Sequence, residues 1–275
     1  MVTGTGEYPL VAEKEYESPS VFGPEKMLRE GRRLRGLPEV EVPAVCLLDP
    51  DGDVSRYLAV DVRGRRHPGW ACYHTDMWTV DVDDVTIGVI GMAVGAPFAV
   101  LVAEQLAASG AQLVISIASA GQISQTDRMP GFVLIDRALR DEGTSAHYLP
   151  PGRWSHLDPA MKARLAGAFD HLPGVVLAGS SWTTDAPYRE TAGAIAAADA
   201  EGITCVEMEA AALYAYATAR GRAVVCLAHV TNAMAATGDD FDKGRDNGVH
   251  HALAVASSVA RACLDGLSGT RSLCP

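Results

Sequence analysis

Two carboxylates flank a methionine in residues 206–214, directly before an alanine-rich run. Residues 203–206 indicate a short strand and the alanine-rich run a helix, so Glu207, Met208 and Glu209 fall at a strand-to-helix junction. Ligands of open α/β folds bind at the carboxyl ends of strands. A carboxylate there can accept two hydrogen bonds from a vicinal diol, and a thioether offers a soft surface to a sugar. The alternative is a solvated Glu pair favoured by the helix dipole.

A glycine-bearing turn occupies residues 91–97, between an apolar strand and a helix predicted over 98–109. Such a turn brings backbone N–H groups toward an anion or a sugar. Only Gly91 and Gly95 are present, whereas a dinucleotide fingerprint requires G-x-G-x-x-G. A tight turn without a ligand is the alternative.

Composition describes an ordinary globular protein of 275 residues, 48% of them apolar and 21% charged. A formal net charge of −11 argues against a nucleic-acid partner, because phosphate backbones are bound by basic patches. A small anionic substrate needs only a local pocket and stays possible. The six cysteines contain no C-x-x-C pair, which favours buried thiols in a reducing compartment and indicates no metal site.

Residues 1–20 are polar and acidic and have neither the basic start nor the apolar stretch of a signal peptide. No apolar run reaches the length of a membrane span. We therefore expect a cytoplasmic protein with no membrane partner. Residues 1–20 are expected to be a flexible segment, followed by one domain over 21–275.

Strands and helices alternate along the chain, which predicts a single α/β domain. The predicted strands are 42–48, 77–82, 85–90, 113–118, 133–135, 175–178, 203–206 and 223–228, the last continuing through 229–232 into a loop. The predicted helices are 24–35, 98–109, 158–169, 191–200, 210–220 and 247–265. Residues 183–190 are expected to form a polar loop.

The order of these motifs resembles the nucleoside phosphorylase/nucleosidase superfamily over roughly residues 20–265. Residues 206–212 resemble its V-x-M-E-A-A/T-A ribose signature, and 95–98 its G-x-G/A-x-P-S turn. Residues 141–148 resemble the D-G-x-S-x-H-F/Y stretch of the uridine-phosphorylase-like subgroup, with one residue added. The resemblance implies a phosphorylase/hydrolase-like fold, a central mixed β-sheet flanked by helices.

The same resemblance implies roles for individual residues. Glu209 would bind the ribose 2′- and 3′-hydroxyls, with Met208 packed on the sugar and Glu207 beside them. Tyr188 would stack on the base, while Arg189 and Glu190 would hydrogen-bond its edge, although a solvated Arg–Glu pair is the alternative.

His229 and Asn232 lie where purine-acting relatives carry a catalytic acid in an S-D segment, here Thr231-Asn232. A histidine can protonate a base near neutral pH, and an asparagine can donate a hydrogen bond without titrating. A structural histidine at a strand end is the alternative.

The nucleophile site departs most from the family. Ser119 and the Gly95 turn keep donors for phosphate, but Ser116 stands where phosphorylases carry an arginine. Lys26 and Arg29 are candidate replacements. Arg56 and His74, from a neighbouring subunit, are two more, and solvated surface charge is the alternative for all four.

The sequence therefore predicts a nucleoside phosphorylase-like enzyme with inorganic phosphate as co-substrate and with no metal or organic cofactor. The alternatives are a nucleoside hydrolase on the same fold and a non-catalytic nucleoside-binding protein. A homo-oligomer, either a dimer or a hexamer, is implied by the resemblance.

Overall fold

The structure is a computed structural model that describes residues 9–10, 12, 14–124, 131–173, 176–233 and 243–267. Ten strands form one mixed sheet, in the order β10-β6-β8-β9-β5-β1-β4-β3-β2 with β7 paired to β6. The strands are β1 (Val45–Asp49), β2 (Arg65–Arg66), β3 (Trp78–Val82), β4 (Val85–Gly91), β5 (Leu113–Gln122), β6 (Phe132–Asp141), β7 (Trp154–His156), β8 (Val176–Thr184), β9 (Cys205–Glu207) and β10 (Ala223–Ala233).

Five of these strands close into a ring. β10 pairs with β6, β6 with β8, β8 with β9, β9 with β5, and β5 again with β10. β5 also pairs in parallel with β1, from which β4, β3 and β2 extend the sheet. Because β1, β4, β5 and β10 are parallel, their carboxyl ends meet at one edge. β9 pairs with Gly121 and Gln122, the last residues of β5, so the turn after β9 reaches that edge too.

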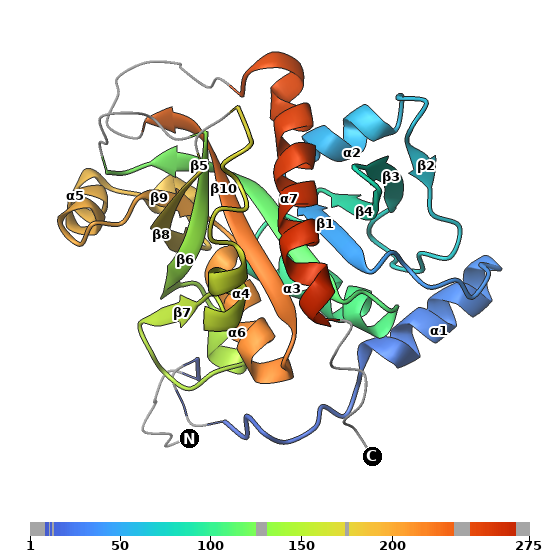
Figure 1. Cartoon of the computed structure of the whole chain (residues 1–275). Coiled ribbons are helices and arrows are strands. Elements are labelled where there is room, and N and C mark those ends of the chain that lie inside the picture. The colour runs from blue at the N-terminus through green and yellow to red at the C-terminus, as the bar shows by residue number, and fades with distance from the viewer. Residues whose placement is uncertain are drawn as a thin grey trace, which may run out of the picture.

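Helices cover both sides of the sheet (Figure 1). They are α1 (Pro24–Arg35), α2 (Asp53–Leu58), α3 (Ala96–Ala108), α4 (Pro159–Arg164), α5 (Ala192–Ala200), α6 (Ala210–Arg220) and α7 (Val249–Leu267), with short 3-10 turns η1 (Ser145–His147), η2 (Pro187–Arg189) and η3 (Arg245–Gly248). In Figure 1, α7 runs along the front of the sheet between α4 and α2, while α3 and α6 pack on each other below.

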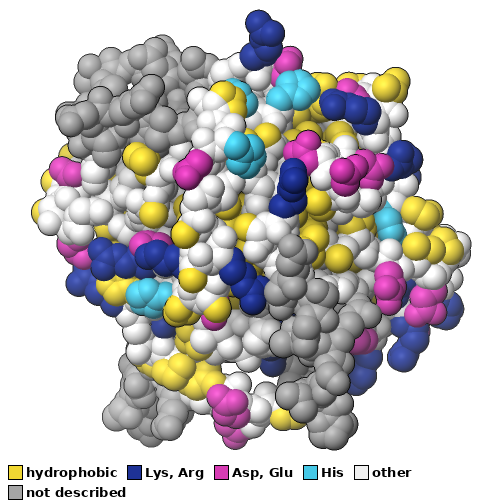
Figure 2. All heavy atoms as spheres, in the orientation of Figure 1, with side chains coloured by type: hydrophobic (Ala, Val, Ile, Leu, Met, Phe, Trp, Pro, Cys, Tyr) yellow, Lys and Arg dark blue, Asp and Glu magenta, His cyan; other side chains and the backbone are white. Residues whose placement is uncertain are grey.

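The core fills the space between these layers, and the parallel strands are buried along nearly their whole length. Cys46, Cys72, Cys205, Cys226 and Cys263 are buried and unpaired, as the sequence predicts. On the face shown in Figure 2, acidic and basic side chains are interspersed. None of the described helices is long and apolar enough to cross a membrane.

The α/β class with one mixed sheet is confirmed. Several predicted boundaries are wrong, among them the ends of β5 and β6, which were predicted at residues 118 and 135 and lie at Gln122 and Asp141. β8 extends to Thr184, into the stretch predicted as a loop, because it pairs along its whole length with β6. α4 ends at Arg164 instead of 169, and β10 continues to Ala233 because β5 pairs with it that far. Half of residues 1–20 lie outside the described residues, so the expected flexibility of this segment stays a prediction.

Candidate active site

Glu207 holds the junction between β9 and α6 together. Its buried carboxylate accepts the N–H groups of Glu209 and Ala210, each at 2.7 Å, and the hydroxyl of Thr183 on β8 at 2.5 Å. Burial raises the pKa of Glu207, while these hydrogen bonds oppose the shift. Both carboxylate oxygens are thus engaged with the protein, at the positive end of the helix dipole. Glu207 therefore positions the junction, and its predicted place at a ribose site stays a prediction.

Glu209 lies under the turn that precedes α3. Its buried Oε1 accepts the N–H of Gly95 at 2.6 Å, a contact between residues 114 positions apart. Gly95 has a φ of +84°, which L side chains rarely adopt, so glycine suits this position. Burial first, and then the neighbouring Glu207, raises the pKa of Glu209 well above its ordinary value. Met208, half-buried, lies between the two carboxylates in sequence.

Ser119 donates hydrogen bonds to an aspartate that the sequence analysis did not single out. Both its N–H, at 3.1 Å, and its hydroxyl donate to Oδ2 of Asp51, in the loop between β1 and α2. Lys243, just before η3, pairs with the same Oδ2 at 3.1 Å and with Asp53 at 2.6 Å. Arg56 pairs with Asp53 at 2.8 Å.

A cavity of about 20 Å³ lies beside this pair, lined by Asp49, Asp51, Asp53, Ser119, His229 and Asn247 among others. That volume accommodates about one water molecule. Burial raises the pKa of Asp49 to about 6, with the adjacent acids adding to the shift.

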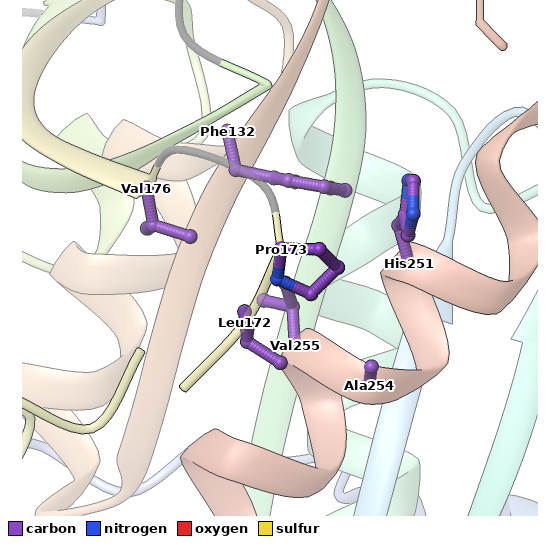
Figure 3. A pocket seen from close by; sticks show the side chains of 7 residues that line it. All are labelled: Phe132, Leu172, Pro173, Val176, His251, Ala254 and Val255. Carbon is purple, nitrogen blue, oxygen red and sulfur yellow. The ribbon is translucent and has the colours of Figure 1, made fainter. Parts of the chain in front are cut away.

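His229 faces this cavity because β10 pairs it directly with Ser119 on β5. Its ring stacks on Phe132, with centroids 4.6 Å apart. Burial first, and then the positive charge of Lys243, lowers its pKa, which favours a neutral imidazole. The sequence predicts that His229 faces the base. In the structure His229 lines the same cavity as Ser119 and Asp51, and its role toward the base stays a prediction. Phe132 also borders an apolar pocket between β6, β8 and α7, where Figure 3 shows it pointing toward His251.

Lys26 and Arg29 do not reach Ser119 within one chain. Both belong to α1, which packs on the far half of α3, where Met27 contacts Gln105. That position is about 15 Å along the helix from Gly95 at 1.5 Å per residue. The geometry of the single chain therefore does not support Lys26 and Arg29 as phosphate ligands, and this call stays a prediction.

Two further basic groups were expected from a neighbouring subunit. In this chain Arg56 donates to the carbonyl of Asp51 and contacts the sulfur of Met92, and its place in a neighbouring subunit's site stays a prediction. His74 packs edge-on against Phe98 in the first turn of α3. Ser116 is buried in β5 and, as the sequence indicates, brings no charge.

The predicted base-side loop follows β8. Tyr188 is 99% exposed and Arg189 is exposed, whereas Glu190 is half-buried and burial raises its pKa. Asp185 in this loop accepts the N–H of Gly143 at 2.9 Å, which joins the loop to the 141–148 stretch. Asn232 pairs through its backbone with Gly121, and its side chain lies outside the described part of the chain.

Residues 45–265 match the Phosphorylase superfamily, and the chain therefore belongs to that superfamily. Among solved structures, the chain is similar to the purine nucleoside phosphorylase of Toxoplasma gondii in complex with immucillin-H. The two share 19% identity and a TM-score of 0.68, over 84% of this chain and 93% of that one. This likeness establishes the fold. No curated protein matches the chain in sequence.

Proposed function

We propose that this protein cleaves the N-glycosidic bond of a nucleoside whose ribose diol is held by Glu209. The observation that carries the proposal is the contact between the Gly95 N–H and the buried Glu209 carboxylate. It brings together the two motifs by which the sequence resembles the superfamily. Met208 then packs on the sugar.

Cleavage of this bond passes through a sugar that carries positive charge. Glu209 lies near other acids, since both Glu207 and Asp51 raise its pKa through their charges. Carboxyl oxygens held next to the sugar can stabilise such a developing positive charge. The base departs toward the loop of Tyr188, Arg189 and Glu190, and Asn232, near the end of β10, is its proposed hydrogen-bond donor. The likeness of residues 141–148 to the uridine-phosphorylase-like subgroup supports a place in that subgroup.

The acceptor of the ribosyl group enters at Ser119. By resemblance it is phosphate, which makes the enzyme a pentosyltransferase, and Ser119 and Gly95 are its proposed ligands. A specific observation supports hydrolysis as a second candidate: the donors of Ser119 are bound to Asp51. A non-catalytic nucleoside-binding protein stays the third alternative.

A panel of purine and pyrimidine nucleosides, each assayed for base release with and without phosphate, tests the proposal. We expect release from at least one ribonucleoside and a much slower reaction when the 2′- and 3′-hydroxyls are both missing. Tight nucleoside binding without any base release would identify a binding protein and overturn the enzymatic proposal.

A further inference from the structure

We infer a second ligand site, apart from Glu209 and Ser119, where α1 packs on the C-terminal end of α3. Its ligand is a compact anion with several negative charges, of the di- or triphosphate class. α1 supplies positive charge, a hollow lies beside it, and polar atoms buried at the junction lack a protein partner. Such a site goes beyond nucleoside cleavage and does not depend on it.

α1 concentrates positive charge in a protein whose formal net charge is −11. Its twelve residues include one lysine and four arginines against two glutamates, and Figure 2 shows basic side chains gathered over this helix. Arg35 donates to a backbone carbonyl at 2.8 Å, and Arg33 pairs with Glu30 at 2.8 Å. Arg29 and Arg32, neighbours on the helix surface, have no ion pair with any described residue. Two guanidinium groups of α1 are therefore left for a ligand.

A hollow of about 610 Å³ lies beside these two arginines. Its lining includes Arg29, Arg32, Arg33 and the buried Leu28, together with Glu25 and Glu39. The glutamates oppose part of the positive charge, so an ion with a single charge gains little there. A pyrophosphate group carries several charges on two adjacent phosphorus centres and can accept forked hydrogen bonds from both unpaired guanidinium groups. The hollow therefore fits a diphosphate better than a single phosphate.

Two buried hydrogen-bond donors at this junction lack a partner in the protein. Nε of Arg32 and the hydroxyl of Ser109 make no hydrogen bond with the described residues, although both atoms are buried. Ser109 directly follows Ala108, which ends α3 and lines the hollow. A buried donor costs free energy until an acceptor satisfies it. A solvated basic helix accounts for exposed arginines but not for these two donors, whereas a bound oxyanion supplies the acceptors they need.

The hollow is separate from the proposed catalytic site. Gly95, which donates to Glu209, directly precedes α3, whereas Ala108 lines the hollow at the other end of that helix. Thirteen residues at 1.5 Å each place the two ends about 20 Å apart. A phosphate acceptor bound at Ser119 and an anion bound at α1 are therefore distinct ligands, which variants can separate.

Titration calorimetry of the full-length protein with pyrophosphate gives the first test. We expect binding that weakens with added salt, and Arg32→Gln should lower the affinity at least about tenfold, since a charge-assisted hydrogen bond is lost. Inorganic phosphate should bind at least about tenfold more weakly than pyrophosphate. Arg153→Gln is the matched control, because Arg153 pairs with Glu201 after α5, on the opposite side of the molecule from α1 (Figure 1). No binding of pyrophosphate, or equal losses in the two variants, would overturn the inference.

Two further variants separate this site from the catalytic one and guard against a misfolded Arg32→Gln protein. Arg29→Gln should also weaken pyrophosphate binding, whereas Ser119→Ala should leave it unchanged. Arg32→Gln should keep the wild-type rate of base release from any nucleoside that the protein cleaves. Binding that is lost in Ser119→Ala and kept in both arginine variants would place the ion at the catalytic site and refute the second site. Absence of base release from every nucleoside would contradict only the proposed function.

Discussion

Glu209 combines a position that favours ribose binding with an environment that disfavours its charge. The carboxylate is buried and receives the N–H of Gly95, yet its neighbours are also acidic. A hydrogen bond to a buried charged group contributes about 1.5–3 kcal/mol. We therefore expect Glu209→Ala to lower kcat/KM by at least about tenfold for ribonucleosides, measured by base release. A variant that keeps the wild-type rate would exclude this residue as the ribose ligand.

The same environment makes Glu209 a source of instability. Because its pKa is raised on folding, the unfolded chain releases the proton first, and folding stability falls as pH rises from the unfolded pKa to the folded one. Glu209→Gln keeps an acceptor for Gly95 without this penalty. Chemical denaturation should show a variant more stable than wild type at alkaline pH and similar to it near pH 4. A gain that does not depend on pH would point to another cause.

Residue-level prediction succeeded where one segment carries the chemistry and failed where folding brings segments together. Glu207, Met208 and Glu209 are adjacent, so one motif was enough to place them at the junction. Asp51 belongs to no such motif, because its partner Ser119 is remote in sequence. The available signal was an alternation of acids directly after the buried strand β1, at the carboxyl edge where ligands bind.

At the scale of elements, Gly91 at the end of β4 and Gly95 just before α3 are required for different reasons. Gly95 needs its positive φ, and an added Cβ there meets open space, with Pro97 at 4.0 Å as the nearest contact. At Gly91 the limit is space, since an added Cβ would lie 1.9 Å from the hydroxyl of Ser55 on α2.

We expect Gly95→Ala to distort the turn over Glu209 at a cost of about 1–3 kcal/mol and to lower activity strongly. Gly91→Ala should instead push α2 away and mainly lower the melting temperature. Thermal unfolding followed by assays at a temperature where both variants are folded would separate the effects. Equal activity losses in the two folded variants would contradict this division.

The type of each element was predictable because strands and helices differ in the spacing of their apolar residues. The ends of an element depend instead on the strands that it pairs with. The alternation of types along the chain gave the class. The extension of β8 to Thr184 comes from β6, and that of β10 to Ala233 from β5, neither of which local sequence reveals. The helix predicted to 169 ends at Arg164, and residue 167, a glycine with a φ of +75°, lies in the turn that follows.

At the scale of the whole molecule, exposed apolar side chains surround the start of α3. Met92 and Val94 precede the helix and Leu101 lies on it, all exposed in the single chain. Patches of this kind mark interaction surfaces. We propose that a second copy of the chain covers them, in line with the homo-oligomer implied by the sequence. Sedimentation should then show a dimer or hexamer, and Leu101→Glu should shift it toward monomer, with Leu177→Glu, an exposed leucine on β8, as the control. A wild-type monomer would refute this surface.

The long pairing of β5 with β10 has a consequence for synthesis of the chain. β5 ends at residue 122, whereas β10 begins at residue 223. During synthesis β5 therefore cannot pair with β10 until most of the polypeptide has emerged. Parallel pairing across such a separation is slow, and a buried apolar strand without its partner is prone to aggregate. We therefore expect Ser119 and His229 to come together late in folding, and a chain cut short before residue 223 would lack the ring as well as the cavity beside Ser119.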